Sequence, residues 1–319
     1  MRYFSLFTGI GGLDVGLEEV GAKCVGFSET KKSSSEIYQR HYPAHENFGD
    51  VTKIDPYDMP DFDVLTGGFP CQSFSIAGLR RGFEDHKDKK GAMVLYIHRI
   101  LVAKQPKFFA LENVKGILNH GGGATFRKVF RLFENAGYNV RCVLLNALYY
   151  GSAQNRERVI FLGSKTEVTN PRPRIVDGTK RFRDFRDGDE KNFVWLRQTA
   201  KNRMRDKIEQ RDPYSYSIVG GYDRMGTLMT GISGGGGRNP SSQQKIVQEA
   251  DGRWRFLTAL EGERLQGFPD GWTAGQSNGA RWFALGNAVH CDVSRYLFKE
   301  YAGQAFGTEW GKLLAQKNG

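Results

Sequence analysis

The chain has 319 residues, which is enough for one large domain with a core of its own and a smaller second domain. Hydrophobic residues make up 39% of the sequence and charged residues 25%, and these ordinary values exclude a disordered or fibrous protein. The formal net charge of +11 favours a polyanionic partner such as nucleic acid, although a basic surface can also serve solubility alone.

The four cysteines are scattered along the chain, at Cys24, Cys71, Cys142 and Cys291. They lack the close pairs of zinc sites and the density of secreted disulfide scaffolds, so we expect no metal site and a reducing compartment. Residues 2–7 are followed too soon by glycines to form a signal peptide, and no stretch reaches about 18 apolar residues. We therefore expect a soluble cytoplasmic protein without a membrane partner.

Residues 1–164 alternate short β-rich runs with amphipathic stretches, which is typical of a parallel sheet covered by helices. The predicted strands span residues 2–7, 23–28, 62–66 and 107–112, followed by a strand pair at 138–147 and 157–164. The predicted helices span residues 13–20, 34–41, 92–104 and 125–136. This pattern indicates an α/β fold with a doubly wound, mostly parallel sheet, in which ligands bind at the carboxyl ends of the strands.

Beyond about residue 165 the composition changes, because Arg, Lys and Asp crowd together through residues 172–212 and a glycine tract follows at 231–237. A helical pattern returns at 258–266 and again at 288–301. We predict a smaller, loop-rich second domain here. The predicted division is a first domain at 1–164, a second domain at 165–275, and a C-terminal segment at 276–319 that packs back on the first domain.

A glycine turn at Phe7–Gly12 joins the first predicted strand to the first predicted helix. Bare backbone in such a turn lets a nucleotide-like ligand approach, and the helix amides can meet a carboxylate or phosphate. The turn lacks the GxGxxG spacing of dinucleotide sites, and alone it can simply form a tight corner. Glu29 follows the second strand, where doubly wound domains place a carboxylate for ribose hydroxyls. Together they indicate an adenosine-type cofactor.

Cys71 follows the third predicted strand, within the segment Gly67–Ser75. Most cysteines are small apolar fillers, but Gly, Pro and Ser flank this one and predict an exposed loop at the functional edge of the sheet. A thiolate in that position can act as a nucleophile. The polar stretch at 78–90, which includes Arg80 and Arg81, has the composition of a lid that closes over a polyanion.

Two further motifs place charged groups near the same edge. Glu112 closes an apolar strand, either as a helix cap or ion-pair partner, or as a partly desolvated acid beside Cys71 that holds a proton. Arg156 and Arg158 alternate at the entry to the strand at 159–163, which directs both to one face of an extended segment. A salt bridge to a surface acid is the alternative for either arginine.

Taken in this order, the motifs resemble those of the cytosine-C5 DNA methyltransferases of bacteria and phage, over nearly the whole chain. The matching segments are Phe7–Gly12, Pro70–Gln72, Glu112–Val114, Gln154–Arg158, Arg255–Glu261 with Arg264–Pro269, and Gly286–Val289. The resemblance implies the S-adenosylmethionine-dependent methyltransferase fold, with residues 1–164 as the catalytic and cofactor-binding domain and residues 165–275 as the target-recognition domain. It also implies methyl transfer to C5 of a flipped cytosine through a covalent bond between Cys71 and C6.

The resemblance further assigns roles to individual residues. Glu112 is expected to hold N3 of the base and Arg158 its O2, with Arg156 as a further catalytic residue. The implied donor pocket consists of Phe7, Gly9, Gly11, Gly12, Leu13, Glu29, Asp50, Val51, Pro70, Asn287 and Val289. The implied contacts to double-stranded DNA come from Gln72, Ser75, Arg80, Arg81, Arg224, Thr227 and Arg238. We expect the protein to act as a monomer.

The sequence departs from the family pattern after Glu29, where an aromatic residue and an acid are usual but Thr30, Lys31 and Lys32 stand here. His290 also replaces a small residue. The lysines either point to solvent or favour a donor with an additional carboxylate on the transferred group. Cytosine-C5 methylation of RNA and a catalytically silent DNA-binding protein are further alternatives. The recognised DNA sequence depends on loop geometry that no motif specifies.

Overall fold

The computed structural model describes residues 1–70, 93–209, 217–228 and 245–315. The chain forms two compact units, each assembled from segments that are distant in sequence. The first unit comprises Met1–Leu145, Glu157–Arg174 and Val293–Gly319, and the second comprises Asn146–Arg156 and Ile175–Asp292. The boundaries predicted at residues 164 and 275 divide the chain into continuous pieces and stay predictions.

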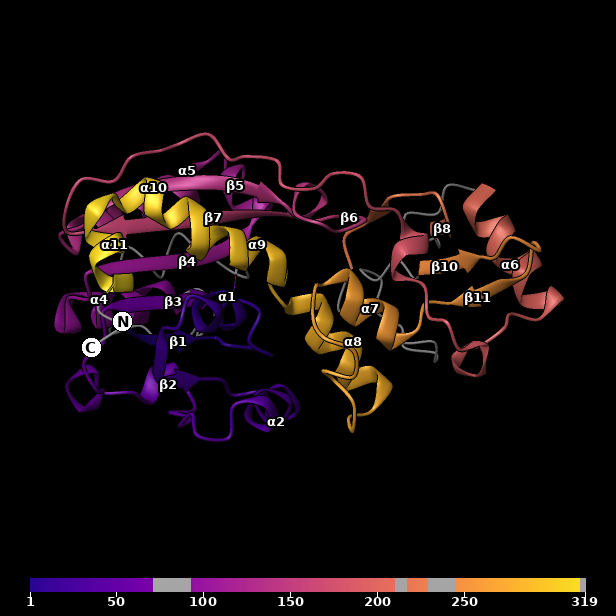
Figure 1. The fold of residues 1–319 in the computed structure, drawn as a ribbon, viewed down its shortest axis with the longest axis horizontal. Helices are drawn as coiled ribbons and strands as arrows, with labels where there is room; N and C mark the ends of the chain where they lie inside the picture. Colours follow the sequence, from indigo (N-terminus) through magenta and orange to yellow (C-terminus); the bar gives the residue numbers. More distant parts are fainter. Residues whose placement is uncertain (71–92, 210–216, 229–244, 316–319) are drawn as a thin grey trace. The chain divides into compact units, whose positions relative to one another are not determined.

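A six-stranded sheet forms the centre of the first unit, with the strand order β2-β1-β3-β4-β7-β5 (Figure 1). Its strands are β1 (Arg2–Leu6), β2 (Lys23–Ser28), β3 (Val64–Gly68), β4 (Phe108–Val114), β5 (Asn139–Asn146) and β7 (Glu157–Ser164). Strand β1 is parallel to both β2 and β3, and β3 is parallel to β4, whereas β4 and β7 are antiparallel. The predicted α/β fold with a mostly parallel sheet is confirmed.

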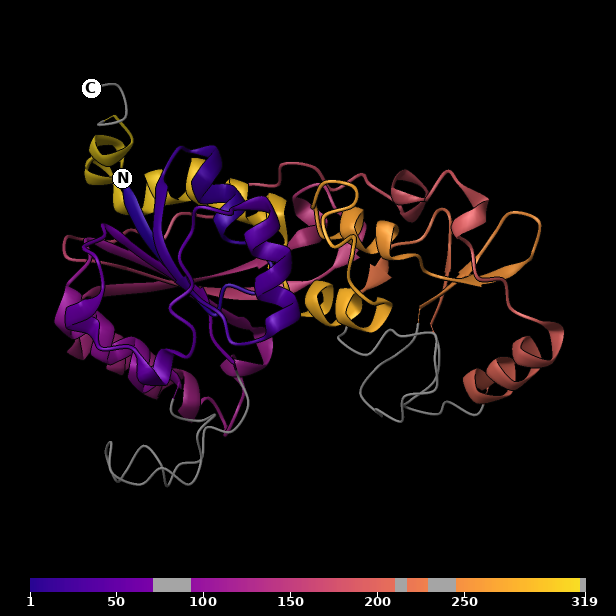
Figure 2. The ribbon, with the colours of Figure 1, turned by 90° about the horizontal axis from the view of Figure 1, so that it is seen from below.

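Helices cover both faces of this sheet, with α4 and α5 on one face and the C-terminal helices on the other (Figure 2). The helices of the first unit are α1 (Asp14–Glu19), α2 (Lys32–His41), α4 (Met93–Lys104), α5 (Ala124–Asn135), η8 (Leu297–Tyr301), α10 (Ala302–Phe306) and α11 (Thr308–Ala315), with α9 (Cys291–Tyr296) leading into them. Short 3-10 turns are η1 (Val51–Lys53), η2 (Pro56–Asp58) and η4 (Lys115–Leu118).

Two adjacent phenylalanines of β4 illustrate why the strand is apolar on both faces. Successive side chains of a strand point to opposite sides. Phe109 packs on Phe133 of α5 at a ring distance of 5.1 Å, while Phe108 packs on Phe306 at 4.4 Å and on Trp310 at 5.5 Å. A continuous apolar run is the expected sequence of a strand buried from both sides.

The order of the strands locates the ligand-binding edge of the sheet. After β1 the chain passes to β2 on one side and then crosses to β3 on the other side of β1. In doubly wound sheets this reversal opens a crevice at the carboxyl ends of the two strands where the direction changes. The glycine turn after β1 and the segment after β3 therefore both leave the sheet at the crevice.

The second unit contains a three-stranded sheet in the order β11-β10-β8 and a short parallel pair of β6 and β9. Its elements are β6 (Gln154–Asn155), β8 (Ser217–Gly220), β9 (Met225–Gly226), β10 (Lys245–Gln248), β11 (Trp254–Phe256), η5 (Ala147–Tyr149), η6 (Phe182–Phe185), η7 (Glu190–Asn192), α6 (Gln198–Glu209), α7 (Ala259–Leu265) and α8 (Asn278–Asn287). Over the described ranges of both units, no helix is long and apolar enough to cross a membrane.

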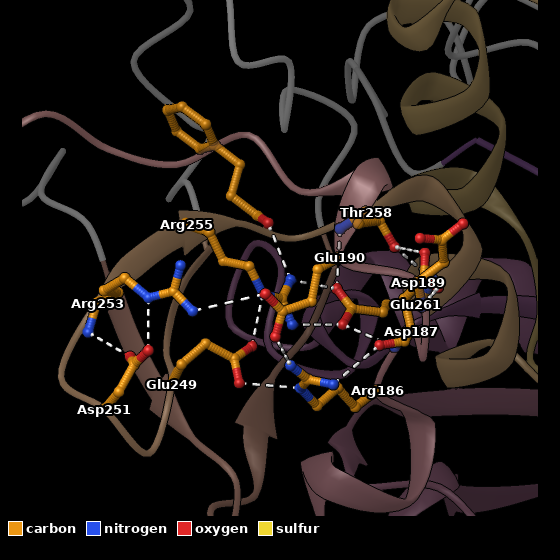
Figure 3. Close-up of polar contacts among 11 residues, drawn as sticks. Arg186, Asp187, Asp189, Glu190, Glu249, Asp251, Arg253, Arg255, Thr258 and Glu261 are labelled. Atoms are coloured by element: carbon orange, nitrogen blue, oxygen red, sulfur yellow. Dashed lines mark hydrogen bonds and ion pairs between the residues drawn. The ribbon is translucent and has the colours of Figure 1, made fainter.

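A network of charged side chains joins β10, β11 and α7 in the second unit (Figure 3). Arg255 forms a bidentate ion pair with Glu261, at 2.6 and 2.9 Å, and both side chains are fully buried. Arg255 also donates to Glu249 at 2.6 Å and stacks on Phe193 at 3.8 Å. Arg186 binds the second oxygen of Glu249 at 2.9 Å. These contacts connect Arg186 and Glu249, which directly follows β10, to strand β11 and helix α7 through buried or partly buried ion pairs.

Candidate active site

The glycine turn predicted after the first strand has a backbone that other residues rarely adopt. Gly9 and Gly11 have φ values of 61° and 88°, and Phe7 itself lies in the left-handed region at 52°. A side-chain atom at Gly11 would also lie 3.0 Å from the ring of Tyr38. Glycine is thus required at position 11 by both conformation and space, and Gly12 continues the buried turn.

Glu29 lies against this turn, as the sequence predicted. One carboxylate oxygen of Glu29 accepts the N–H of Gly9 at 2.9 Å, and the other accepts the N–H of Lys31 at 2.6 Å. The two backbone donors hold the carboxylate in a defined orientation beside the turn. The structure therefore brings together a bare backbone turn and an acid, which are the two parts expected of a nucleoside site.

Three further residues predicted for the donor pocket also lie in the first unit. Asp50 caps η1 by accepting the N–H of Thr52 at 2.9 Å, and Val51 is buried. Leu13 precedes α1, and its carbonyl accepts a hydrogen bond from Ser294 at 2.7 Å. The C-terminal helices thus tie directly to the end of the glycine turn.

A buried polar network behind the turn was not foreseen from the sequence. Asp14 is fully buried and accepts hydrogen bonds from Ser5 at 3.0 Å and from Tyr38 at 2.8 Å. Burial raises the pKa of Asp14 from 3.8 to about 6, although these two donors oppose the shift. Tyr38 in turn lies 2.9 Å from Nδ1 of His45. An acid in the first helical turn after a glycine turn was the available sequence signal.

The acid predicted to act on the base lies at the end of β4. Nε of Arg158 lies 2.7 Å from an oxygen of Glu112, and their side chains are only 12% and 9% exposed. Glu112 pairs with Ile160 across the antiparallel ladder, and Arg158 is two residues from Ile160 on the same face. Gly68, the last residue of β3, pairs with Glu112. The strand register therefore places this ion pair beside the end of β3.

The residue after Glu112 fixes the chain that leaves β3. The buried amide of Asn113 donates to the carbonyl of Phe69 at 3.0 Å, and its oxygen accepts the N–H of Val114 at 2.9 Å. The ring of Phe69 packs on Phe161 at 6.1 Å, and the next residue, Pro70, is exposed. Cys71, Gln72, Ser75, Arg80 and Arg81 lie outside the described residues, so their predicted roles stay predictions.

The two arginines predicted to share one face have different surroundings. Arg158 pairs with Glu112 in the first unit, whereas Arg156 is fully buried in the second unit. The guanidinium of Arg156 donates to main-chain carbonyls, including that of Ala288 at 2.6 Å. The predicted catalytic role of Arg156 stays a prediction. Asn287 is exposed and Val289 is buried, and both belong to the second unit, whereas the glycine turn belongs to the first. Their predicted contacts to the donor therefore also stay predictions.

Two residues predicted to contact DNA make polar contacts within the second unit. Arg224 donates to the carbonyl of Gly178 at 2.6 Å, and Thr227 donates to the carbonyl of Asn155 at 2.7 Å. The glycine tract at 231–237 and Arg238 lie outside the described residues.

The turn between β8 and β9, which also carries Arg224, has an exposed aromatic residue. Tyr222 is 76% exposed, and the guanidinium of Arg183 lies 4.4 Å above its ring. The N–H of Arg183 donates to the carbonyl of Gly221 at 2.8 Å, and the N–H of Phe182 donates to that of Asp223 at 3.0 Å. Two main-chain hydrogen bonds therefore hold this Tyr–Arg pair in place on the surface.

The residues that depart from the family pattern have ordinary partners. The side chain of Lys32 is 90% exposed, and its Nζ lies 3.8 Å from a carboxylate oxygen of Glu36, one turn further along α2. Lys31 is exposed at the start of the same helix. His290 is buried, and its Nδ1 accepts the N–H of Asp292 at 3.2 Å. The position of Lys32 agrees with the interpretation that this lysine points to solvent.

A family model and individual related proteins identify the same family for this chain. A family model described as C-5 cytosine-specific DNA methylase matches residues 1–302. The Type II methyltransferase M.NgoBI of Neisseria gonorrhoeae is 35% identical over 274 residues, which cover 84% of this chain and 83% of that protein. The Orphan methyltransferase M.SPRI of Bacillus phage SPR is 38% identical over 247 residues, 73% of this chain, and the match spans about half of that protein, 55%.

A solved structure supports the fold independently. The Dnmt2 methyltransferase of S. pombe has a TM-score of 0.76 at 20% identity, with 95% of this chain and 98% of that chain covered. This likeness confirms the predicted S-adenosylmethionine-dependent methyltransferase fold. The chain belongs to the C-5 cytosine-specific DNA methylases, a family of enzymes whose methyl donor is S-adenosylmethionine.

Proposed function

We propose that this chain is a DNA (cytosine-5-)-methyltransferase that links Cys71 covalently to C6 of a flipped cytosine in double-stranded DNA. The observation that supports this most directly is the 2.7 Å ion pair of Glu112 and Arg158 on the strands next to β3. The chain leaves β3 through Phe69, which Asn113 anchors, and continues toward Cys71. An acid and a cation therefore lie beside the strand that leads to the nucleophile.

The glycine turn fits an adenosine-type donor. A side-chain atom built at Gly9 would meet nothing within 4 Å, so the space beside this bare backbone is open. The carboxylate of Glu29 lies at the same turn and suits the ribose hydroxyls, while Phe7 would stack on adenine and Asp50 would accept from its amino group. When bound, S-adenosylmethionine supplies an electrophilic methyl group on a sulfonium sulfur.

The chemistry assigned to the protein side chains begins with the thiolate of Cys71. It adds to C6 of cytosine, which removes the C5–C6 double bond and makes C5 nucleophilic. Negative charge then develops on the ring at N3 and O2. Glu112 donates a proton or a hydrogen bond to N3, and Arg158 donates to O2 while it orients Glu112. Once C5 carries the methyl group, the C5 proton leaves to water, and the bond between sulfur and C6 breaks to restore the thiolate and the C5–C6 double bond. A proton taken up at N3 returns to Glu112.

A base inside a duplex is inaccessible to these groups, so the target cytosine has to be flipped out of the stack. We propose that the second unit binds the DNA, with Arg224 and Thr227 among the contacts. The exposed Tyr222 adds an aromatic face to the turn that carries Arg224, and Arg183 of η6 adds a cation above its ring. Phosphate contacts position a protein on the duplex and base contacts specify the sequence, and the net charge of +11 favours both kinds of encounter.

The named relatives suggest the setting in which this activity is used. They are a type II methyltransferase of Neisseria gonorrhoeae and an orphan methyltransferase of a Bacillus phage. We propose that the chain modifies DNA at a specific sequence, as a monomer, in the cytoplasm of a bacterium or of a phage-infected cell.

The test is methyl transfer from S-adenosylmethionine to duplex DNA, with the product identified by mass spectrometry. We expect 5-methylcytosine from the wild type, no product from Cys71→Ser, and a kcat lower by about 10²–10⁴ for Glu112→Gln. Glu157→Gln is the matched control, because Glu157 pairs with Lys115 at 2.8 Å on the partly exposed side of the same ladder. A Cys71→Ser protein with full activity would contradict the covalent mechanism.

The same assay separates the alternatives. Transfer to RNA but not to duplex DNA would identify an RNA enzyme instead. A product that carries an extra carboxylate on C5 would identify an altered donor. DNA binding without any transfer would identify a catalytically silent relative.

A further inference from the structure

The polar side chains of Gln154 in β6 and of Arg156, the residue directly after β6, are buried in the second unit, although their residue types favour water. Gln154 is 0% exposed and Arg156 is 1% exposed, while Asn155 between them is exposed. Side chains alternate along an extended segment, so the two residues share the inward face. A buried guanidinium is tolerated only when it is hydrogen-bonded, and its partners therefore show what the pair holds.

One set of partners lies in the segment Met225–Leu228. Gln154 accepts the N–H of Leu228 at 2.8 Å, and Arg156 donates to the carbonyl of the same Leu228 at 3.1 Å. Both main-chain polar groups of this buried residue are thus bound by the pair. Parallel pairing of β6 with β9 and the hydrogen bond from Thr227 to Asn155 extend the contact. The segment is held in one register.

The other set of partners lies in the segment Gly286–Val289. The second terminal nitrogen of Arg156 donates to the carbonyl of Gly286 at 2.8 Å and to that of Ala288 at 2.6 Å. These two residues flank Asn287. Gln154 also donates to the carbonyl of Leu265 at 3.2 Å, at the end of α7. A single planar cation therefore binds carbonyls from two segments that are about 60 residues apart in sequence.

We propose that Gln154 and Arg156 are positioning residues that couple DNA target discrimination to donor affinity. They would do so by holding Met225–Leu228 and Gly286–Val289 in one fixed arrangement. The inference rests on the proposed function, with Thr227 as a DNA contact and with Asn287 and Val289 as the donor contacts that the family resemblance implies. A shift of either segment changes the carbonyl positions around Arg156, and that change reaches the other segment through the same guanidinium.

The chemistry of the cation makes the inference testable with a small substitution. Arginine presents donors in a rigid planar fork, whereas lysine has the same charge on a single flexible ammonium. Arg156→Lys therefore keeps the charge among the carbonyls of Leu228, Gly286 and Ala288 but cannot bind all three in the same geometry. Arg253→Lys, on the surface of the same unit, is the matched control because its side chain is 51% exposed.

The experiment measures three quantities for the full chain: the thermal midpoint, the Kd of S-adenosylhomocysteine by calorimetry, and the ratio of kcat/KM on the preferred DNA site to that on single-mismatch sites. For Arg156→Lys we expect about tenfold weaker binding and about tenfold less discrimination, because each follows from loss of roughly one buried hydrogen bond. We expect kcat at saturation to change less, and Arg253→Lys to change none of these quantities.

A purely structural role would lower the thermal midpoint of Arg156→Lys and leave both Kd and discrimination unchanged, and this result would overturn the proposal. A change in only one of the two would also overturn it, because the coupling requires both. If Arg156→Lys fails to fold, Gln154→Met provides a second comparison. It removes the acceptor for the N–H of Leu228 and the donor to the carbonyl of Leu265, and it leaves Arg156 in place. Absence of methyl transfer by the wild type would instead refute the proposed function. Donor binding is measured by calorimetry independently of transfer, so the two failures can be told apart.

Discussion

Replacement of Glu261 by Gln removes one charge from an ion pair whose two side chains are both fully buried in the second unit. Each carboxylate oxygen of Glu261 accepts two donors (Figure 3). One oxygen binds Arg255 at 2.6 Å and the N–H of Asp187 at 3.1 Å, and the other binds Arg255 at 2.9 Å and the N–H of Thr258 at 2.9 Å.

A glutamine side chain cannot satisfy these four donors. Its amide has one accepting oxygen, so the NH₂ group faces two donors in either orientation. In the variant the buried Arg255 keeps its ion pair with Glu249, at 2.6 Å, but loses the one with residue 261. Removal of one partner from a buried pair costs about 3–5 kcal/mol, and we expect Glu261→Gln to lower the free energy of unfolding by that amount.

Urea unfolding followed by tryptophan fluorescence measures this loss, with Asp251→Asn as the control. Asp251 pairs with Arg253 on the surface of the same unit, where solvent screens the charges, so the control should unfold with the wild type. If Glu261→Gln lowers the free energy of unfolding by less than about 1 kcal/mol relative to the wild type, the reasoning from buried charge is refuted.

Three other outcomes follow from the structure. Gly11→Ala should weaken S-adenosylhomocysteine binding in calorimetry, because φ is 88° and the new methyl group would lie 3.0 Å from a tyrosine ring. The pKa of Asp14 is about 6 in the folded chain, against 3.8 for an ordinary aspartate, so its protonated form contributes stability below pH 4 that is lost as pH rises through 6. In urea unfolding across that range Asp14→Asn should remove this loss of stability, and an unchanged pH dependence would contradict the expectation. Tyr222→Ala and Arg183→Ala should weaken DNA binding, with a salt slope reduced by about one for the arginine, whereas Tyr57→Ala, also on the surface, should leave binding unchanged.

The sequence by itself was sufficient for the central strands and most helices of the first unit, although not for α10 and α11, and for the parts of its site that lie within one motif. Predicted strands at 23–28 and 157–164 coincide with β2 and β7. Alternation of strands and helices and the two-sided burial of Phe108 and Phe109 are local properties, which periodicity reports directly. The glycine turn with Glu29 was also predictable, because topology alone brings the ends of β1 and β2 to one edge.

Only the tertiary structure decided which polar groups are buried and which partners they have. Arg156 and Arg158 are two residues apart and looked equivalent, yet Arg156 binds carbonyls up to 132 residues away while Arg158 pairs with Glu112. Likewise Asp14 finds its donor Tyr38 24 residues further along the chain. A buried polar group needs a partner, but the sequence does not say which distant segment supplies it, because that depends on how the elements pack.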